Sequence, residues 1–303
     1  MSLRDLGLLV VLGAIWGASY LFLRIAAPVI GVLPLIDLRV VIAAAALFLY
    51  ALALGRRPAL RSRWRSLLLL GALNAAVPFT LIAAATLYLN ASMASILNAT
   101  TPLFTAVVAA LWMQEPLGWR RLLGLALGLI GVGVLMGWSP IGLSSHVALG
   151  VICSLGGALC YGVGGVFTKT RFQGAAALDL ALGQQVAAGL LLLPLAVVAW
   201  QPQPATPAVW ISVLALGLLS TAVGYLIYFD LIARVGPTNT LSVTFLVPLF
   251  GTLWGVLFLN EPMRISLFAG LAVILTGVFL VTGAGVAEPS PAAIAQIDTG
   301  APS

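Results

Sequence analysis

The chain has 303 residues, of which 62% are hydrophobic and only 7% are charged. Its mean hydropathy of +1.15 excludes a soluble globular protein, because so few polar side chains cannot cover a water-exposed surface. Lipid must therefore surround much of the chain. The formal net charge of +6 needs no nucleic-acid partner to explain it, because the basic residues follow a topology rule.

Ten apolar stretches of about twenty residues follow one another along the chain. Each is long enough, at ~1.5 Å per residue, to cross a ~30 Å hydrocarbon core as an α-helix. The composition thus predicts an all-α integral membrane protein with short connections and no separate soluble domain. The predicted spans are Leu6–Ala27, Pro34–Leu54, Ser66–Tyr88, Met93–Met113, Arg120–Trp138, Val147–Lys169, Leu178–Trp200, Ala208–Leu231, Thr238–Leu259 and Ile265–Gly283.

Basic residues gather at alternate ends of these spans. Arginine and lysine near helix ends accumulate on the cytoplasmic side of a membrane. The pattern therefore predicts a bacterial inner-membrane protein with cytoplasmic N- and C-termini, and a disordered cytoplasmic tail over residues 284–303. The predicted cytoplasmic segments hold Arg4, Arg56, Arg57, Arg61, Arg63, Arg65, Arg120, Arg121, Lys169, Arg171 and Arg234, whereas the external loops hold only Arg264.

The two halves of the chain repeat each other. Tyr88–Gly137 aligns without a gap on Arg234–Gly283, with thirteen identical pairs. A weaker match places Trp16 over Tyr161. Because each unit contains five crossings, the second copy (146–283) must enter the membrane upside down relative to the first (1–140). Inverted repeats of this kind suit a carrier that opens alternately to either side.

Several motifs recur at equivalent positions of the two halves. They are Pro102 with Pro248, Glu115-Pro116 with Glu261-Pro262, and the glycine-spaced helix after each Glu-Pro pair; the first helix reads Trp16-Gly17-Ala18-Ser19-Tyr20. With these motifs the chain resembles the EamA-type ten-helix exporters of the drug/metabolite transporter superfamily, which include bacterial aromatic amino acid exporters. The resemblance implies export of amino acids or other small metabolites through a central cavity lined by helices 1, 3, 4, 6, 8 and 9.

Polar and aromatic side chains at mid-membrane are the candidates for contact with a cargo, because such groups are costly in lipid unless they are paired or face a wet cavity. The rings would stack on an apolar or aromatic group, and the asparagines would bind an amino or carboxylate group. Helix packing is the competing interpretation for each of them. The predicted substrate-binding residues are Trp16, Tyr20, Asn74, Asn98, Tyr161, Tyr225 and Trp254.

Pro78, Pro102 and Pro248 are predicted hinges, because a proline inside a helix removes a backbone donor and clashes with the preceding turn. The recurring glycines of helices 5 and 10 are more typical of close helix packing than of a ligand site. Glu115 and Glu261, each ahead of a proline at a helix end, are more typical of caps than of proton carriers.

Charged side chains are scarce near mid-membrane. No carboxylate, histidine or lysine falls there in the predicted spans, which argues against a central proton relay. Arg24, Asp37 and Arg39 are placed at the outer ends of helices 1 and 2, where an ion pair is favoured over a weak anion site. We therefore expect an uncharged, aromatic central cavity.

The sequence leaves other functions open. An intramembrane enzyme would need a nucleophile with a base or a metal set, and no such set, metal site or cofactor motif is present. Carriers of phosphate esters or nucleotide sugars call for deep Lys or Arg. A channel, or an exporter of drugs or other small organic solutes, remains an alternative. The favoured prediction is an exporter of amino acids that works by alternating access, and apolar and aromatic amino acids are the favoured cargo. One chain contains both halves of a pathway, so we expect a monomer to be sufficient.

Overall fold

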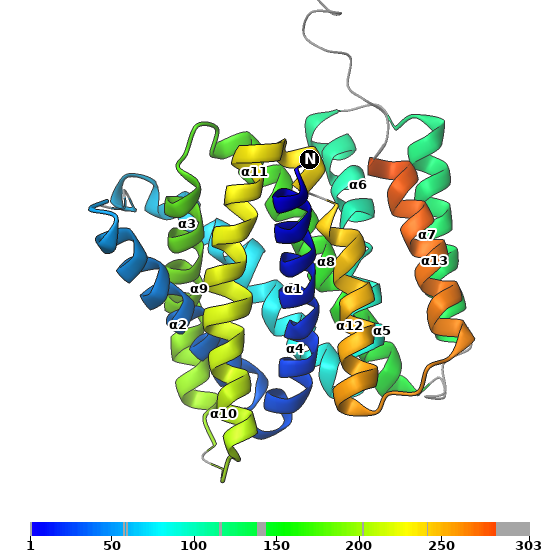
Figure 1. Ribbon diagram of the computed structural model, residues 1–303, viewed down its shortest axis with the longest axis horizontal. Coiled ribbons are helices and arrows are strands. Elements are labelled where there is room, and N and C mark those ends of the chain that lie inside the picture. Colours follow the sequence, from blue (N-terminus) through cyan, green and yellow to red (C-terminus); the bar gives the residue numbers. More distant parts are fainter. Residues whose placement is uncertain are drawn as a thin grey trace, which may run out of the picture.

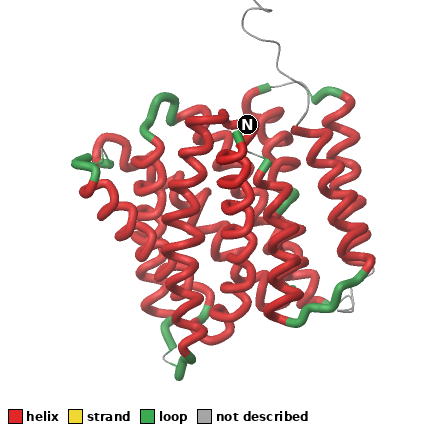
Figure 2. The backbone as a smooth tube through the Cα atoms, viewed as in Figure 1, coloured by secondary structure: helices red, strands yellow, loops and turns green. Residues whose placement is uncertain are grey.

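The computed structural model describes residues 2–56, 58, 60–114, 117–137, 144–201, 203–240 and 242–282. Over these ranges all regular structure is helical, and no strand occurs (Figure 2). The long helices run side by side in one bundle (Figure 1). This arrangement satisfies backbone hydrogen bonds within each helix, as lipid requires.

The elements of the first half are α1 (Leu3–Ile30), α2 (Val32–Ala53), the 3-10 turn η1 (Arg61–Arg63), α3 (Trp64–Gly71), the π-helical segment η2 (Ala72–Ala76), α4 (Val77–Tyr88), α5 (Ala91–Asn98), α6 (Thr101–Met113) and α7 (Trp119–Gly137). The second half consists of α8 (Ser145–Arg171), α9 (Ala177–Ala199), α10 (Pro207–Leu214), the π-helical segment η3 (Ala215–Val223), α11 (Gly224–Thr240), α12 (Val243–Leu259) and α13 (Ile265–Thr282).

Consecutive elements combine into the ten crossings that the sequence predicts. α3, η2 and α4 are continuous, as are α10, η3 and α11, and each of these sets makes one crossing. α5 and α6 together also make one crossing, Ala91–Met113. Within the described residues, eight of the resulting helices are long and apolar enough to span a membrane. α12 is a shorter apolar helix of 17 residues, and α7 has 19 residues. The predicted all-helical fold is confirmed.

One predicted boundary, the end of the eighth crossing, is wrong. The eighth crossing continues to Gly236, well past the predicted end at Leu231, and kinks there at a φ of 82°. The non-helical backbone of Gly236 separates the short helical stretch that follows it, up to Thr240, from the eighth crossing, so the structure does not contradict the predicted start of the ninth crossing at Thr238. Glycine at 236 permits this backbone conformation, which side chains with a Cβ rarely adopt. The predicted tail 284–303 and the Glu115-Pro116 motif lie outside the described residues.

The fourth crossing is interrupted where Pro102 predicts a disturbance. α5 ends at Asn98, and α6 starts at Thr101 with Pro102 in its first turn. Proline lacks the N–H that would bond to the Asn98 carbonyl, and the Thr101 hydroxyl donates to that carbonyl instead, at 2.7 Å. Pro78 likewise lies in the first turn of α4, directly after η2. Pro248, by contrast, lies inside the continuous helix α12.

The two π-helical segments occupy equivalent positions of the repeat. With the offset of 146, the gapless alignment extends back to pair Trp64 with Trp210, and η2 then falls on the same stretch as η3. In the same register Asn74 pairs with Ser220, and Phe79 pairs with Tyr225. A π-helical turn leaves carbonyls with altered partners and often marks a functional position in a helix. Both halves therefore carry this irregularity on their third helix.

The first helix of each half packs in the other half. α1 contacts α10, η3, α11 and, most extensively, α12. Its counterpart α8 packs against α4, α5 and α6 of the first half. Figure 1 shows α1 in the middle of the bundle beside α12. The close approach of α1 to α12 requires glycine at position 17, because a Cβ there would lie 2.8 Å from the Gly251 nitrogen.

α7 and α13 form a pair at one edge of the bundle (Figure 1). Their backbones meet at glycines on both helices: a Cβ on Gly124 would lie 2.5 Å from the Gly277 carbonyl, and one on Gly131 would lie 2.9 Å from the Ile274 nitrogen. The predicted packing role of these glycines is confirmed. This pair corresponds to helices 5 and 10, which the family resemblance places at the periphery.

Candidate functional site: a buried arginine among aromatic side chains

Arg39 is a deeply buried cation in the bundle. It lies seven residues into α2, about 10 Å along the helix from its start, and is only 6% exposed. Its Nε donates to the Thr221 hydroxyl of η3 at 2.9 Å, and its Cζ lies 3.7 Å from the centre of the Phe79 ring. The guanidinium thus joins α2, α4 and η3. The prediction of an uncharged interior is therefore wrong. The sequence placed Arg39 near a helix end, and it did not show that its side chain is buried against Thr221 and Phe79.

The predicted ion pair at the ends of helices 1 and 2 is also wrong. Arg24 donates instead to the Thr86 carbonyl, at 2.7 Å. In the described part of the chain neither Arg24 nor Arg39 forms an ion pair with Asp37, whose Oδ1 is buried without a hydrogen-bond partner. Backbone carbonyls and a threonine hydroxyl therefore take the role that the sequence assigned to the carboxylate.

Three of the predicted substrate-binding tyrosines surround Arg39. Tyr20 of α1, Tyr161 of α8 and Tyr225 of α11 all lie within electrostatic reach of the guanidinium. Tyr161 also packs edge-on against the Phe79 ring, with the ring centres 6.3 Å apart. Because α1 and α8 are the exchanged helices, both halves of the protein contribute to this cluster, which we call the Arg39 cluster.

Two amides extend the polar side of the Arg39 cluster. The Tyr20 side chain interacts with the Asn98 amide at the end of α5, and the Tyr225 side chain interacts with the Gln184 amide of α9. The Asn98 Oδ1 atom is buried and has no hydrogen-bond partner within the protein. It lies where α5 ends, beside the interruption of the fourth crossing.

Trp16 borders the Arg39 cluster through Tyr225. The two ring centres are 6.3 Å apart, and Trp16 also packs on Tyr228 at 5.4 Å. The indole N–H donates to the Ser220 carbonyl at 3.1 Å. That carbonyl is accessible to the indole because the N–H of Gly224 reaches back five residues, to Leu219, instead of the usual four. The π-helical turn therefore supplies the acceptor that fixes Trp16.

Trp254 and Asn74 make their contacts elsewhere. The Trp254 indole donates to the Ala14 carbonyl at 3.0 Å and packs between Phe250 and Phe258 on α12. Asn74 of η2 packs against Gly164 of α8, where a side chain would collide with it. These contacts are typical of helix packing. The substrate-binding role of both residues stays a prediction.

Sequence reasoning missed Arg39, Thr221 and Phe79 as one site. The repeat offers a signal for it, because Phe79 and Tyr225 are equivalent positions that both lie beside Arg39. Phe79 lies three residues after η2, and Tyr225 lies two residues after η3. The sequence pattern that could have indicated this site is an aromatic residue at the same place in both repeats, together with a single arginine in an apolar helix.

At the end of the bundle opposite the N-terminus, Glu261 joins the two halves. Its Oε1 accepts from the Ala91 N–H at 2.6 Å, and its Oε2 accepts from the N–H and the hydroxyl of Ser92 at 3.0 and 2.5 Å. These are the first donors of α5, so the carboxylate of one half caps a helix of the other. The predicted capping role of Glu261 is confirmed.

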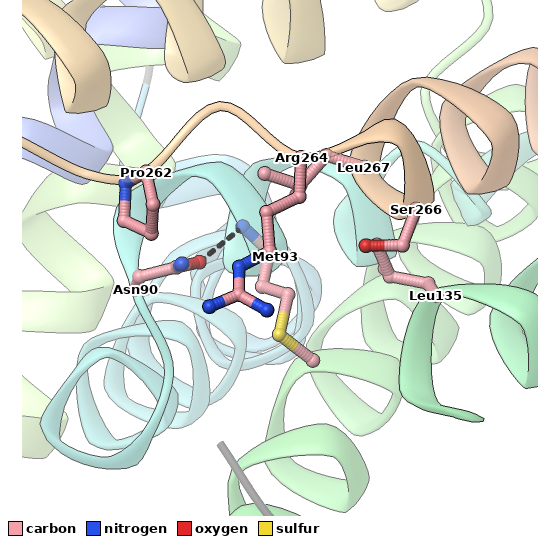
Figure 3. A pocket seen from close by; sticks show the side chains of 7 residues that line it. All are labelled: Asn90, Met93, Leu135, Pro262, Arg264, Ser266 and Leu267. Atoms are coloured by element: carbon pink, nitrogen blue, oxygen red, sulfur yellow. Dashed lines mark hydrogen bonds between the residues drawn. The ribbon is translucent and has the colours of Figure 1, made fainter. Parts of the chain in front are cut away.

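The segment after Glu261 covers the start of α5. Figure 3 shows Arg264 lying close to Asn90 and Met93, below the segment that leads to Leu267. The Asn90 side chain accepts from the Met93 N–H at 2.8 Å and so completes the cap of α5. The pocket in this view is about the size of one water molecule, at roughly 10 Å³. This pocket is too small for a cargo.

Comparison with known proteins assigns the chain to a family. The uncharacterized transporter YvbV of Bacillus subtilis is 28% identical over 293 residues, which cover 94% of this chain and 93% of the relative. The probable terminal-alkyne amino-acid exporter of Streptantibioticus cattleyicolor is 27% identical over 269 residues, which cover 88% and 89% of the two chains. A crystal structure with 19% sequence identity matches with a TM-score of 0.67 over 92% of this chain and 97% of that one, which shows the same fold.

The family model of the EamA-like transporters matches twice, over residues 5–137 and 148–283. The two matches correspond to the two five-helix halves. This chain is therefore a multi-pass membrane protein that belongs to the EamA-like transporter family.

Proposed function

We propose that the protein exports small metabolites of the amino-acid class across a bacterial inner membrane, with both termini in the cytoplasm. The observation that carries the proposal is the Arg39 cluster, which combines aromatic rings, amides and one cation between two inverted halves. The name of the Streptantibioticus relative, a probable amino-acid exporter, agrees with this cargo class. The distribution of arginine and lysine supports the orientation.

The Arg39 cluster suits both ends of an amino acid with an apolar or aromatic side chain. The rings of Tyr161, Tyr225 and Trp16 offer faces and edges on which such a side chain stacks. The unpartnered Oδ1 of Asn98 is an acceptor for the ammonium group of the cargo. Binding would then satisfy a buried polar atom that the protein leaves without a partner.

The exchanged helices α1 and α8 connect this binding to alternating access. Each belongs by sequence to one half and packs in the other, and each contributes a tyrosine to the Arg39 cluster. A cargo held there contacts both halves at once, so movement of one half against the other carries the site from one side to the other. Pro102 and Pro248 remain predicted hinges, and one chain supplies the complete pathway.

Counterflow in proteoliposomes tests the function. We expect purified protein to exchange labelled phenylalanine or leucine for the unlabelled amino acid with saturation, and to ignore sugar phosphates. Tyr161→Leu should lower the rate at least about tenfold, whereas Tyr50→Leu, on the exposed surface of α2, should not. Exchange of a sugar phosphate or of neutral drugs, without exchange of any amino acid, would contradict the proposal.

A further inference from the structure

Arg39 has more hydrogen-bonding capacity than the protein uses. A guanidinium carries five N–H donors, and the described contacts account for one of them, from Nε to Thr221, together with the ring face of Phe79. No carboxylate lies within ion-pair distance of Arg39 among the residues that the structure describes. The four N–H groups on the two terminal nitrogens are left to be satisfied.

A buried cation without a counter-ion is costly inside a membrane protein. Such residues normally pair with an acid, face a water-filled cavity or mark a binding site. The neighbours of Arg39 do not supply the missing charge, because Tyr20, Tyr161 and Tyr225 carry neutral phenols at physiological pH. The fold holds the guanidinium firmly, through threonine on one side and phenylalanine on another, while leaving its charge uncompensated.

We propose that Arg39 is the binding subsite for the carboxylate group of the cargo. The inference rests on the proposed function and names the group that would select the cargo. A carboxylate matches the planar fork of the terminal nitrogens in a bidentate pair, which a neutral polar group does not. It would supply the counter-charge, and the neighbouring tyrosine hydroxyls are additional donors to its oxygens.

The surroundings favour a monoanion over a phosphate ester. A dianion would call for a second cation in the Arg39 cluster, and within the described residues the cluster contains tyrosines and amides but no further Lys or Arg. Tyr20 interacts with Asn98 and also lies within reach of Arg39. The two head groups of an amino acid thus find their partners on either side of one tyrosine: carboxylate at Arg39, ammonium at Asn98.

Competition in proteoliposomes tests this subsite with the wild-type protein. Phenylalanine counterflow is measured against 3-phenylpropionate, which keeps the carboxylate and lacks the amine, and against 2-phenylethylamine, which keeps the amine and lacks the carboxylate. We expect 3-phenylpropionate to compete at least about tenfold better. Equal competition by the two compounds would overturn the proposal even if no variant of Arg39 folds.

Variants of Arg39 then locate the effect. Arg39→Gln should raise the KM for phenylalanine at least about tenfold and abolish the preference for 3-phenylpropionate, while Arg39→Lys should retain part of it. Thr221→Val, which keeps the charge but removes the acceptor of Nε, should weaken the preference severalfold. Arg61→Gln, on the exposed end of the bundle, is the control for loss of a positive charge. An unchanged preference in Arg39→Gln would refute the subsite.

Failure of this inference and failure of the proposed function give different results. If amino acids are exchanged but the carboxylate is not needed for competition, the proposed function stands and the carboxylate subsite at Arg39 is refuted. If no amino acid is exchanged, binding of 3-phenylpropionate is measured directly by its effect on thermal unfolding. If 3-phenylpropionate stabilises the wild-type protein but not Arg39→Gln, the carboxylate subsite stands and the cargo is a carboxylate other than an amino acid. If it stabilises neither protein, the subsite is refuted together with the proposed function.

Discussion

Replacement of Glu261 by alanine would remove a carboxylate that links the two halves at the end opposite the N-terminus. The side chain is 8% exposed and accepts three hydrogen bonds, from the N–H groups of Ala91 and Ser92 and from the Ser92 hydroxyl. Helix α5 starts at Ala91, so its first two N–H groups have no partner within the helix. Ala91 and Ser92 are both 0% exposed in the native structure, so these N–H groups lose a buried acceptor together with the carboxylate.

The cost can be estimated from these donors. Each buried N–H left without an acceptor costs about 1–3 kcal/mol. Loss of a negative charge at a helix N-terminus adds about 0.3–2 kcal/mol. With two such N–H groups, the variant should lose roughly 2–8 kcal/mol of stability. Glu261→Gln keeps one acceptor oxygen and most of the shape, and should lose about half as much.

Thermal unfolding of the purified protein measures the loss. By the scaling of about 2–4 °C per kcal/mol found for soluble domains of about 150–250 residues, Glu261→Ala should lower the Tm by at least about 4 °C. Asp230→Asn is the matched control, because its exposed pair with Arg234 at 2.8 Å is worth only about 0.3–0.5 kcal/mol. If Glu261→Ala and Asp230→Asn shift the Tm equally little, the carboxylate does not hold the halves together and the reasoning fails.

Two further predictions concern helix packing and the interruption before α6. Gly124→Val should lower the Tm by several degrees, because its Cβ would meet a backbone carbonyl of α13 at 2.5 Å, whereas Gly133→Val, with open space around it, should change it little. A similar loss in both variants would contradict the close packing of α7 and α13. Thr101→Val should destabilise the protein by about 1–2 kcal/mol, since it strips the Asn98 carbonyl of its donor. Adding Pro102→Ala to Thr101→Val should recover part of that loss, because alanine supplies a backbone N–H for the Asn98 carbonyl. If the stability changes of the two single variants simply add up in the double variant, this compensation is refuted.

The sequence by itself determined the fold class and the internal symmetry. Apolar stretches of membrane-spanning length can only be helices in lipid, because every backbone polar group must be satisfied within the segment. The repeat of Pro102 at Pro248 and of Glu115 at Glu261 predicted two copies of one five-helix unit, which the family match over both halves agrees with. These conclusions need only local composition and spacing.

The same local signals predicted several details correctly. Pro102 disturbs its helix because the missing N–H is a property of that residue alone. The glycines of α7 and α13 allow close packing because they lack a Cβ, whatever helix they meet. Glu261 caps a helix as its position at a helix end indicated, although the sequence did not reveal that the capped helix belongs to the other half.

The tertiary structure alone decided where the charge lies. Arg39 appeared to belong to a helix end, and its burial depends on Thr221, which is 182 residues away, and on Phe79. The rotation and depth of each helix against its neighbours bring these side chains together, and neither quantity is encoded in the hydropathy of a single span. The exchange of α1 and α8 between the halves is likewise a matter of packing between distant segments. Spacing along the chain fixes which residues share one helix face, but only the packed bundle fixes what that face meets.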